Sequence, residues 1–412
     1  MTRAELARLL GAPAGLVAEE RREAVVVEDR DPHRFMAALA AAAAQGGTVI
    51  LASEAWGQAE RAQLALLQKQ AAVTPATAAG KGWLCVPTGG TGGQLKLARH
   101  DEETIAAAVG GFHRHFRSAG FNAVGVLPLH HVSGLMAWMR CALTGCEYRP
   151  LDWKKIEAGE LPALPEKRQG WVISLVPTQL ERLLRSVAAI EWLQGFRIIF
   201  LGGAPAWPEL LARAAAAQLP LSLGYGMTET AAMVTALRPE EFLLGARDNG
   251  AALEHAAVQV DRDGVISVAG DSLFRGYHPD WRDRRPFATG DLGRLDGRGH
   301  LHVLGRRDAV IISGGEKVDP AEVEAALRGT GEFSEVVVVG VPDADWGQAV
   351  VAAYPLGQRP DLAKVEQKVA SHLAGWKRPK RYVAVADWPA NAAGKVDRAG
   401  VARRVRDLKL ET

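Results

Sequence analysis

The chain has 412 residues, of which 48% are hydrophobic and 23% charged, and it contains 44 glycines and 21 prolines. This composition is typical of a globular protein and excludes a collagen-like or largely disordered chain, while the length predicts two or three domains. The 49 basic residues nearly balance the 47 acidic ones. Because the sequence has no long block of like charge, we expect no nucleic-acid partner.

The cysteines and the apolar segments indicate the compartment. The three cysteines, Cys85, Cys141 and Cys146, lack the paired short spacing of a zinc site. The N-terminus has no apolar signal core, and no apolar run approaches the roughly 18 residues that cross a bilayer. We therefore expect a cytoplasmic protein without a membrane span.

Up to about residue 250, predicted helices alternate with predicted strands. Asp31 is a predicted N-cap before Pro32, and the alanine-rich helix that follows is expected to end at Gln45, before a glycine pair. Apolar runs of strand length lie at 48–52, 83–86, 123–127, 171–176 and 197–201. Amphipathic stretches at 178–189 and 208–218 are expected to be helices. This alternation predicts an α/β fold with largely parallel sheets, whose ligands bind at loops beyond the carboxyl ends of the strands.

After about residue 250 the pattern changes to short alternating strands, at 264–270 and 300–305, which predicts a β-rich module that completes the large domain. A helix at 320–328 is expected next, with strands near Val336, Val350 and Val383. These elements suggest a separate α+β unit. We place the domain boundary at residues 306–308, which gives domains of residues 1–305 and 309–412.

The segment TGGTGGQLK, residues 88–96, follows a predicted strand and combines four glycines, two threonines and a lysine. Exposed backbone N–H groups, hydroxyl donors and an ammonium group suit a polyphosphate ligand. The segment matches neither the Walker A spacing nor the dinucleotide-binding glycine pattern. On these residues alone, a flexible surface loop is an equal alternative.

Two further segments place polar groups after apolar runs. In LGYGMTET, residues 223–230, a ring, a hydroxyl and a carboxylate in successive loop positions could stack a base, contact a phosphate and hold magnesium. A turn before a helix capped by Thr228 is the alternative. In ATGDL, residues 288–292, Asp291 could accept hydrogen bonds from two ribose hydroxyls or form an Asx-type turn. The runs 305–324 and 389–398 could each be solvated loops.

Together and in this order, these five segments resemble the acyl-adenylate-forming (AMP-binding) superfamily of acyl-CoA synthetases, adenylation domains and luciferases. The resemblance spans residues 83–398. It implies an α/β fold with a large N-terminal domain of parallel sheets with helices and a β-rich module, followed by a small mobile α+β C-terminal domain. The implied cofactors are ATP, CoA and Mg²⁺. Only 87 residues precede the phosphate loop, so we expect an abbreviated N-terminal subdomain.

The resemblance also implies a role for individual residues. Where the family usually has Ser, Thr and Pro in the phosphate loop, this chain has Gly89, Gly92 and Leu95, so fewer hydroxyls face the triphosphate. The implied phosphate-loop residues are Thr88, Gly89, Gly90, Thr91, Gly92, Gly93 and Lys96. The implied adenine site comprises Gly202, Gly203, Ala204 and Tyr225.

The remaining implied roles concern catalysis and domain motion. Thr228 is expected to contact phosphate, Glu229 to bind Mg²⁺, and Asp291 and Arg306 to bind the ribose, with Arg306 also contacting phosphate. Lys395 is expected to bridge the attacking carboxylate and the α-phosphate. The predicted hinge is Asp308, and the turn that leaves room for the pantetheine arm of CoA contains Gly314 and Gly315.

The acid substrate is suggested by LPLHHVSGLMAWMR, residues 127–140, which resembles the 2-succinylbenzoate CoA ligases of menaquinone and phylloquinone biosynthesis. A dicarboxylate substrate keeps one charged group, which the guanidinium of Arg140 could bind. A structural arginine paired with a neighbouring acid is the alternative. Ser133 and Gly134 could shape the pocket. His131 could line it or be a packed, hydrogen-bonded histidine, and Met227 could form its apolar wall or belong to the core.

Other functions stay open at this point. The chain could adenylate another aromatic or short acid and pass it to CoA or to a carrier-protein thiol. It could also be a non-catalytic AMP-binding protein, although Lys395, Glu229 and Asp291 in their motifs speak against that. A homodimer is possible.

Overall fold

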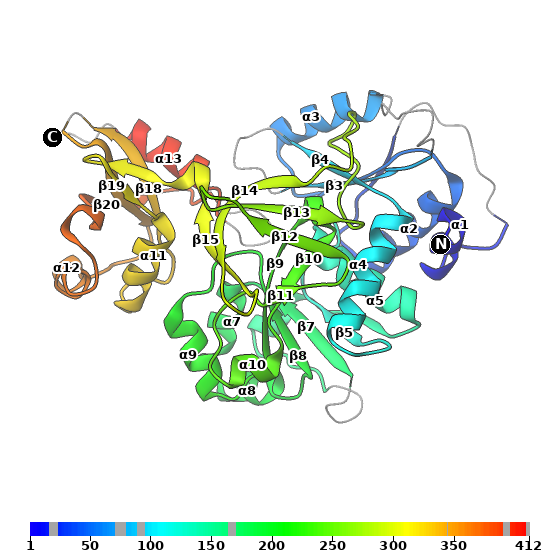
Figure 1. The fold of residues 1–412 in the computed structure, drawn as a ribbon, viewed down its shortest axis with the longest axis horizontal. Helices are drawn as coiled ribbons and strands as arrows, with labels where there is room; N and C mark the ends of the chain where they lie inside the picture. Colours follow the sequence, from blue (N-terminus) through cyan, green and yellow to red (C-terminus); the bar gives the residue numbers. More distant parts are fainter. Residues whose placement is uncertain are drawn as a thin grey trace.

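The computed structural model describes residues 1–15, 24–70, 80–88, 95–163, 170–343, 345–389 and 396–408. Within these ranges the strands form four sheets, each covered by helices or by a neighbouring sheet (Figure 1). The first three sheets belong to the large N-terminal domain, and the fourth belongs to the small C-terminal domain. The α/β fold expected from the sequence is thus confirmed.

The first sheet is formed near the N-terminus, and its first three strands are parallel while the fourth is antiparallel. Its strands, in spatial order, are β1 (Val25–Val27), β2 (Val49–Leu51), β3 (Leu84–Pro87) and β4 (Leu97–His100). The helices beside it are α1 (Arg3–Leu9), α2 (Pro32–Gln45) and α3 (Gln58–Lys69). The predicted helix α2 is confirmed with its cap, because the Asp31 side chain accepts a hydrogen bond from the Arg34 N–H at 2.9 Å.

The second sheet forms the centre of the large domain. Its strands, in spatial order, are β11 (Ala251–Ala252), β10 (Ala232–Ala236), β9 (Leu221–Met227), β8 (Ile198–Leu201), β7 (Trp171–Leu175), β5 (Asn122–Gly125) and β6 (Tyr148–Pro150). The strands from β6 to β9 are parallel, as expected, whereas β10 pairs antiparallel with both β9 and β11. The prediction of largely parallel sheets therefore holds for this sheet and not for its last two strands.

Helices cover both faces of the second sheet. Helices α4 (Glu102–His115) and α5 (Val132–Thr144) lie on one face, where they share a core of phenylalanines with the strands. The other face is covered by α6 (Trp153–Glu157), α7 (Pro177–Leu183), α8 (Val187–Leu193), α9 (Pro208–Ala216) and α10 (Pro239–Leu243). The single helix expected over 178–189 is wrong: Ser186 accepts a hydrogen bond from the Ala189 N–H and so begins the new helix α8.

The third sheet is the β-rich module expected after residue 250, and it is antiparallel throughout. Its strands, in spatial order, are β12 (Ala256–Val260), β13 (Val265–Gly270), β14 (Phe287–Leu295) and β15 (Leu301–Arg306). A short 3₁₀ helix, η3 (Arg307–Ala309), leads from β15 to the C-terminal domain.

The C-terminal domain lies at the left of Figure 1 and has its own core on both faces of its sheet. The strands in spatial order are β17 (Glu316–Val318), β16 (Ile311–Ser313), β19 (Gly347–Pro355) and β18 (Val337–Asp343), with β20 (Arg381–Val385) parallel to β19. The helices are α11 (Pro320–Gly329), α12 (Leu362–Ala370), α13 (Arg398–Asp407) and the 3₁₀ helix η4 (Gly375–Lys377). An α+β unit was expected here, and the structure confirms it.

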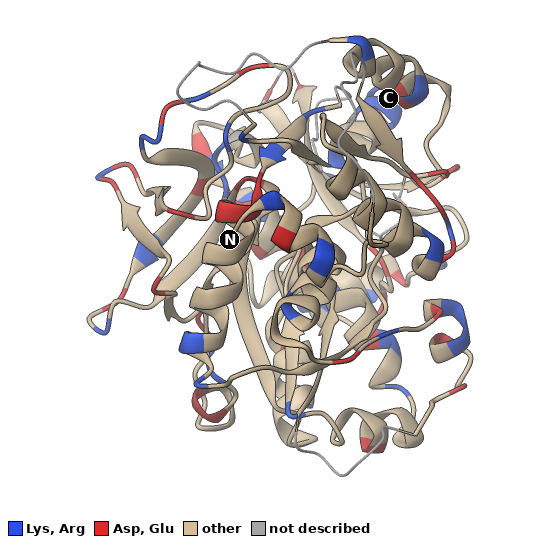
Figure 2. Ribbon diagram, turned by 90° about the vertical axis from the view of Figure 1, so that its right-hand side faces the viewer, with Lys and Arg blue, Asp and Glu red and all other residues tan. Residues whose placement is uncertain are grey.

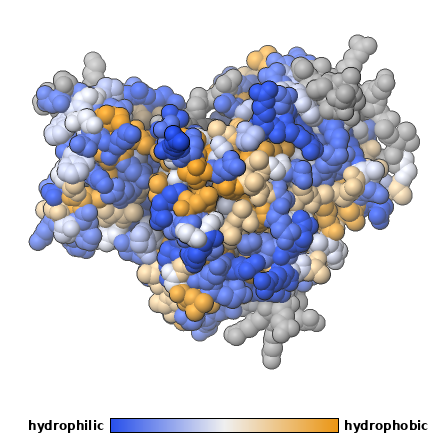
Figure 3. Space-filling view, in the orientation of Figure 1, coloured by the Kyte–Doolittle hydropathy of each residue, from blue (hydrophilic) through white to orange (hydrophobic). Residues whose placement is uncertain are grey.

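Among the described residues, side chains on the α7–α9 side contact the C-terminal domain. Arg182 Nη2 lies 3.6 Å from Glu335 Oε1, and the Arg328 guanidinium lies 5.2 Å from the centroid of the Trp207 ring. In Figure 2, Lys and Arg residues lie interspersed with Asp and Glu residues. Hydrophilic residues predominate on the face shown in Figure 3, with smaller hydrophobic groups among them. In the part of the chain that the structure describes, no helix has the length and apolar character needed to span a membrane.

Candidate active site

Three residues expected to bind the nucleoside come together where the second and third sheets meet. The Tyr225 hydroxyl donates a hydrogen bond to Asp291 Oδ2 at 2.6 Å, and Arg306 Nη1 lies 3.3 Å from Asp291 Oδ1. Asp291 and Arg306 are directly opposite each other on β14 and β15, so the strand register holds them side by side. Burial and the nearby Asp291 raise the pKa of Tyr225, which therefore stays a hydrogen-bond donor at neutral pH.

The strand positions of these residues differ from the loops that the sequence suggested. Tyr225 lies on β9, because β9 continues to Met227 and pairs with β10. A β-carbon at Gly226 would lie 1.9 Å from the Ala232 carbonyl oxygen, so only glycine allows this close pairing. Neither the helix capped by Thr228 nor an Asx turn at Asp291 forms, since Thr228 begins a 3₁₀ turn and Asp291 lies within β14. Gly202, Gly203 and Ala204 follow β8 directly, at its carboxyl end.

Thr228 and Glu229 lie on the 3₁₀ helix η2 (Thr228–Thr230), and both are buried. His100 supports this turn from β4, because its Nε2 donates to the Thr228 carbonyl oxygen at 2.7 Å. Burial lowers the pKa of His100 to about 4, so this imidazole is neutral at physiological pH. The Glu229 carbonyl oxygen accepts a hydrogen bond from the Phe274 N–H at 2.8 Å. Backbone contacts therefore fix the turn before any ligand binds.

The Glu229 carboxylate is suited to a magnesium ion. Tyr277 donates a hydrogen bond to its Oε1 at 2.5 Å. Across the described ranges no Lys, Arg or His forms an ion pair with Glu229, so none of these described residues neutralises its charge. A buried carboxylate in this state fits Mg²⁺, which prefers oxygen ligands.

The segment predicted to bind phosphate begins and ends next to this corner. The Thr88 N–H donates to the Lys96 carbonyl oxygen at 2.9 Å, which closes the loop at its base. Lys96 is exposed, and its Nζ lies 5.5 Å from the centroid of the Tyr277 ring. The intervening residues predicted to bind phosphate lie outside the described residues: Gly89, Gly90, Thr91, Gly92 and Gly93.

Helix α5 carries the residues expected to bind the acid. A β-carbon at Gly134 would lie 2.3 Å from the Pro128 carbonyl oxygen, so glycine is required where the chain turns into this helix. His131 is partly buried, with its ring 4.3 Å from that of His130, and Ser133 is exposed. Met227 is partly buried at the end of β9.

Arg140 lies deeper on the same helix, and its guanidinium lies over an aromatic ring. It is 8% exposed, and its guanidinium carbon lies 3.8 Å from the centroid of the Phe112 ring. Its Nε is buried without a hydrogen-bond partner, and burial lowers the pKa of Arg140 to about 10. A cavity of about 10 Å³ adjoins it, which is room for about one water molecule. No carboxylate among the described residues pairs with Arg140, unlike a structural arginine held by an acid.

Two histidines near Arg140 were not singled out from the sequence. His113 and His255 are buried, and none of their ring nitrogens has a hydrogen-bond partner. Burial, and secondly the charge of Arg140, lowers the pKa of each histidine to about 4. His255 packs where Gly111 of α4 leaves space, since a β-carbon there would lie 1.9 Å from its Nδ1. Single histidines outside any motif give no sequence signal, so only the fold reveals them.

The predicted residues of the C-terminal domain are placed as follows. Lys395 lies outside the described residues. Asp308 belongs to η3, between β15 and β16. Gly314 and Gly315 form the turn between β16 and β17 with φ of +60° and +84°, which favours glycine, and Gly314 packs against Trp346.

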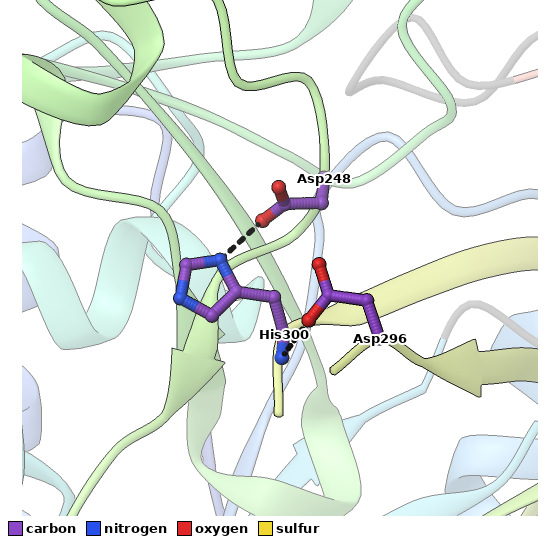
Figure 4. Close-up of side chains that lie close together, drawn as sticks. All are labelled: Asp248, Asp296 and His300. Carbon is purple, nitrogen blue, oxygen red and sulfur yellow. Dashed lines mark hydrogen bonds and ion pairs between the residues drawn. The ribbon is translucent and has the colours of Figure 1, made fainter. Parts of the chain in front are cut away.

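A second polar cluster, shown in Figure 4, comprises Asp248, Asp296 and His300. His300 Nδ1 lies 2.9 Å from Asp248 Oδ1, and the His300 N–H donates to Asp296 Oδ1 at 3.0 Å. Arg298 Nη2 contacts both carboxylates, at 3.0 and 3.2 Å. Because Arg298 and His300 contact both acids, the cluster links the β14–β15 turn to the loop after α10.

Two family models and several curated proteins match most of this sequence. An AMP-binding enzyme family model matches residues 9–278, and an AMP-binding enzyme C-terminal domain model matches residues 322–395. The 2-succinylbenzoate–CoA ligase of Enterococcus faecalis is 33% identical over 285 residues, which cover 66% of this chain and 58% of that protein. The corresponding ligase of Geobacillus kaustophilus is 34% identical over 337 residues, covering 76% and 64%. The chain thus spans about three fifths of the length of these curated relatives.

Solved structures of ligand-bound enzymes have the same fold. The Bacillus subtilis o-succinylbenzoate CoA synthetase with its acyl-adenylate intermediate has a TM-score of 0.74 and 22% identity, covering 97% of this chain and 91% of that chain. ATP-bound MatB from Rhodopseudomonas palustris has a TM-score of 0.75 and 23% identity, covering 98% and 93%. These two likenesses concern the fold alone. Since the first family model covers more than half of the sequence, this chain belongs to the AMP-binding enzyme family.

Proposed function

We propose that the protein is an ATP-dependent CoA ligase that converts 2-succinylbenzoate to 2-succinylbenzoyl-CoA, in menaquinone or phylloquinone biosynthesis. The observation that carries the choice of acid is Arg140, a buried cation without an acidic partner in the described part of the chain. Burying a lone charge is costly, so a protein retains one mainly where a ligand supplies the opposite charge. The names of the relatives support the same substrate.

The reaction has two steps. In the first, the aliphatic carboxylate of 2-succinylbenzoate attacks the α-phosphorus of ATP, the bond to the β-phosphate oxygen breaks, and pyrophosphate leaves. In the second, the CoA thiolate attacks the acyl carbon and AMP leaves. Arg140 holds the aromatic carboxylate, which does not react, and so orients the acid. With His131, Ser133, Gly134 and Met227, Arg140 forms the acid site of this proposal.

The proposed nucleotide-binding residues form sites for the ribose, the adenine and the phosphates. Asp291 and Arg306 bind the ribose, and the Tyr225 ring together with residues 202–204 forms the adenine site. Thr88, Thr228, Lys96 and the loop at 89–93 bind the phosphates, where the positive charge of Lys96 stabilises charge that develops on the transferred group. Glu229 would hold Mg²⁺, which supplies charge neutralisation at the phosphates when bound.

The two steps require different residues, and we propose that the C-terminal domain, residues 309–412, turns about Asp308 between them. Lys395 serves the first step by bridging the attacking carboxylate and the α-phosphate. Gly314 and Gly315 serve the second, because their lack of side chains leaves room for the pantetheine arm. The three cysteines, which are free thiols in the structure, support a cytoplasmic enzyme.

Product analysis tests the proposal. The purified protein is incubated with ATP, Mg²⁺, CoA and one acid at a time: 2-succinylbenzoate, benzoate or acetate. Pyrophosphate release and the mass of the thioester are measured together. We expect 2-succinylbenzoyl-CoA and negligible product from the monocarboxylates. Pyrophosphate release with another acid alone would preserve the mechanism and refute the substrate, and no release with any acid would refute the activity.

A further inference from the structure

Tyr277 lies between two charges that the proposed reaction uses. Its hydroxyl donates a hydrogen bond to Glu229 Oε1 at 2.5 Å, and the Lys96 Nζ lies 5.5 Å from the centroid of its ring. Glu229 belongs to η2, and Lys96 directly precedes β4. A single side chain outside the motifs thus contacts a residue of the proposed metal site and a residue of the phosphate site.

The position of Tyr277 is fixed by the strand beside it. The Arg99 N–H donates to the Gly276 carbonyl oxygen at 2.9 Å, and the His278 N–H donates to the Leu97 carbonyl oxygen at 2.8 Å. These bonds on both sides of Tyr277 attach its segment to β4. The Phe274 ring meets the Tyr277 ring at a centroid distance of 4.9 Å. The phenol is therefore held in place before ATP or a metal ion binds.

This arrangement affects whether Lys96 and Glu229 form an ion pair with each other. Two opposite charges in one corner attract, and a direct ion pair between them would have to break before phosphate and metal could bind. In the described part of the chain, neither residue forms an ion pair. Tyr277 gives Glu229 a neutral donor, and it offers the negative face of its ring to the Lys96 ammonium. Burial, and secondly Glu229, raises the pKa of Tyr277, so its hydroxyl stays protonated at neutral pH.

We propose that Tyr277 is a positioning residue of the adenylation step, which holds Glu229 in place for Mg²⁺ and keeps Lys96 from pairing with it. The inference rests on the proposed function, in which these two residues bind the metal and the triphosphate. It concerns only the first half-reaction, because attack by the CoA thiolate on a formed acyl-adenylate involves neither Mg²⁺ nor the triphosphate.

Tyr277→Phe removes the hydroxyl and keeps the ring, and so tests the contact with Glu229. A hydrogen bond between a neutral donor and a buried charge accounts for about a 10- to 100-fold effect. We expect kcat/KM for pyrophosphate release to fall by about that factor, and the Mg²⁺ concentration at half-maximal rate to rise severalfold. Thioester formation from supplied acyl-adenylate should stay within about twofold of the unaltered protein. Tyr277→Leu, which also removes the ring, should raise KM for ATP further.

Tyr354→Phe is the matched control, because it removes a hydroxyl from a largely buried tyrosine in the C-terminal core. It should leave the Mg²⁺ dependence unchanged. The inference would be overturned if Tyr277→Phe kept the Mg²⁺ dependence of the unaltered protein, or if both half-reactions declined equally, as a structural role would predict.

A binding measurement separates this inference from the choice of acid. Calorimetric titration with a non-hydrolysable ATP analogue, at several Mg²⁺ concentrations, needs no acid substrate. Mg²⁺-dependent binding that weakens in Tyr277→Phe would support the role of Tyr277 even if 2-succinylbenzoate proved not to react. Binding that is equal in the two proteins at every Mg²⁺ concentration would refute it.

Discussion

Replacing Arg140 by methionine should make the protein more stable and a poorer enzyme. Arg140→Met removes the charge and replaces the arginine by a shorter, unbranched apolar side chain on α5. In the unliganded protein the guanidinium is buried against Phe112 without an acidic partner in the described residues. The substitution therefore removes an unfavourable buried charge from the free protein and a favourable ion pair from its complex with the acid.

The size of the stability change follows from two opposing terms. Burial lowers the pKa of Arg140 to about 10, more than two pKa units below its ordinary value, which costs the charged form about 3 kcal/mol. Stacking of a desolvated guanidinium on an aromatic ring stabilises by about 2 kcal/mol. Arg140→Met removes both the cost of burying the charge and the gain from stacking, so the free energy of unfolding should rise by about 1 kcal/mol. Loss of the ion pair to the aromatic carboxylate should lower kcat/KM by about 100-fold or more.

Urea unfolding, followed by tryptophan fluorescence, measures the first effect, and pyrophosphate release with 2-succinylbenzoate measures the second. Arg197→Met is the matched control, because Arg197 is exposed and its guanidinium lies 5.1 Å from the centroid of the Phe121 ring. It should leave kcat/KM unchanged and give no gain in stability. A loss of stability in Arg140→Met would show that the folded protein itself compensates the charge, and an unchanged kcat/KM would refute the carboxylate site.

Three further predictions concern Lys395, a buried ion pair and buried histidines. Lys395→Ala should abolish pyrophosphate release but leave thioester formation from supplied acyl-adenylate largely intact, and equal losses would refute the alternation of domains. Asp101→Asn removes one of the two acidic partners of buried Arg275, whose Nε lies 2.7 Å from Asp101 Oδ2, while Glu103 stays 2.9 Å from its Nη2. The free energy of unfolding, measured in urea, should fall by about 2–3 kcal/mol, and a fall below about 1 kcal/mol would contradict this reasoning. Burial lowers the pKa of His100 and of His255 to about 4, below the value near 6.5 of the unfolded chain. The unfolded chain then binds more protons, so stability is complete above about pH 6.5 and is lost as the pH falls toward 4, by about 2 kcal/mol per histidine at pH 5. His255→Asn should make the fall in unfolding free energy between pH 7 and 5 shallower, and an unchanged fall would contradict the buried neutral state.

Local signals in the sequence were sufficient for much of the fold. Helix α2 begins after Asp31 and ends before the glycines that follow Gln45. A capping residue and a helix-ending glycine act within a few residues, so the sequence alone indicates both ends. The break between α7 and α8 was missed, since Ser186 within an amphipathic stretch is a weak signal. The strand character of Tyr225 was missed because it depends on pairing with β10, and such pairing is a property of the fold rather than of the segment.

In the candidate site, too, some features could be predicted from the sequence and others only from the fold. The motifs singled out Tyr225, Asp291 and Arg306, but their mutual contacts arise from the register of β14 and β15 and from the meeting of two sheets. Tyr277 and His255 belong to none of the motifs singled out in the sequence, and each contacts a residue distant in sequence. Residues of this kind can be found only when the fold brings their partners to them.

The most direct test of the account compares two acids that differ in a single group. 3-Benzoylpropionate is 2-succinylbenzoate without the aromatic carboxylate, and it keeps the carboxylate that reacts. If Arg140 binds the aromatic carboxylate, kcat/KM for pyrophosphate release should be about 100-fold or more higher with 2-succinylbenzoate, because the analogue leaves the buried guanidinium unpaired. Equal values for the two acids would contradict the central claim.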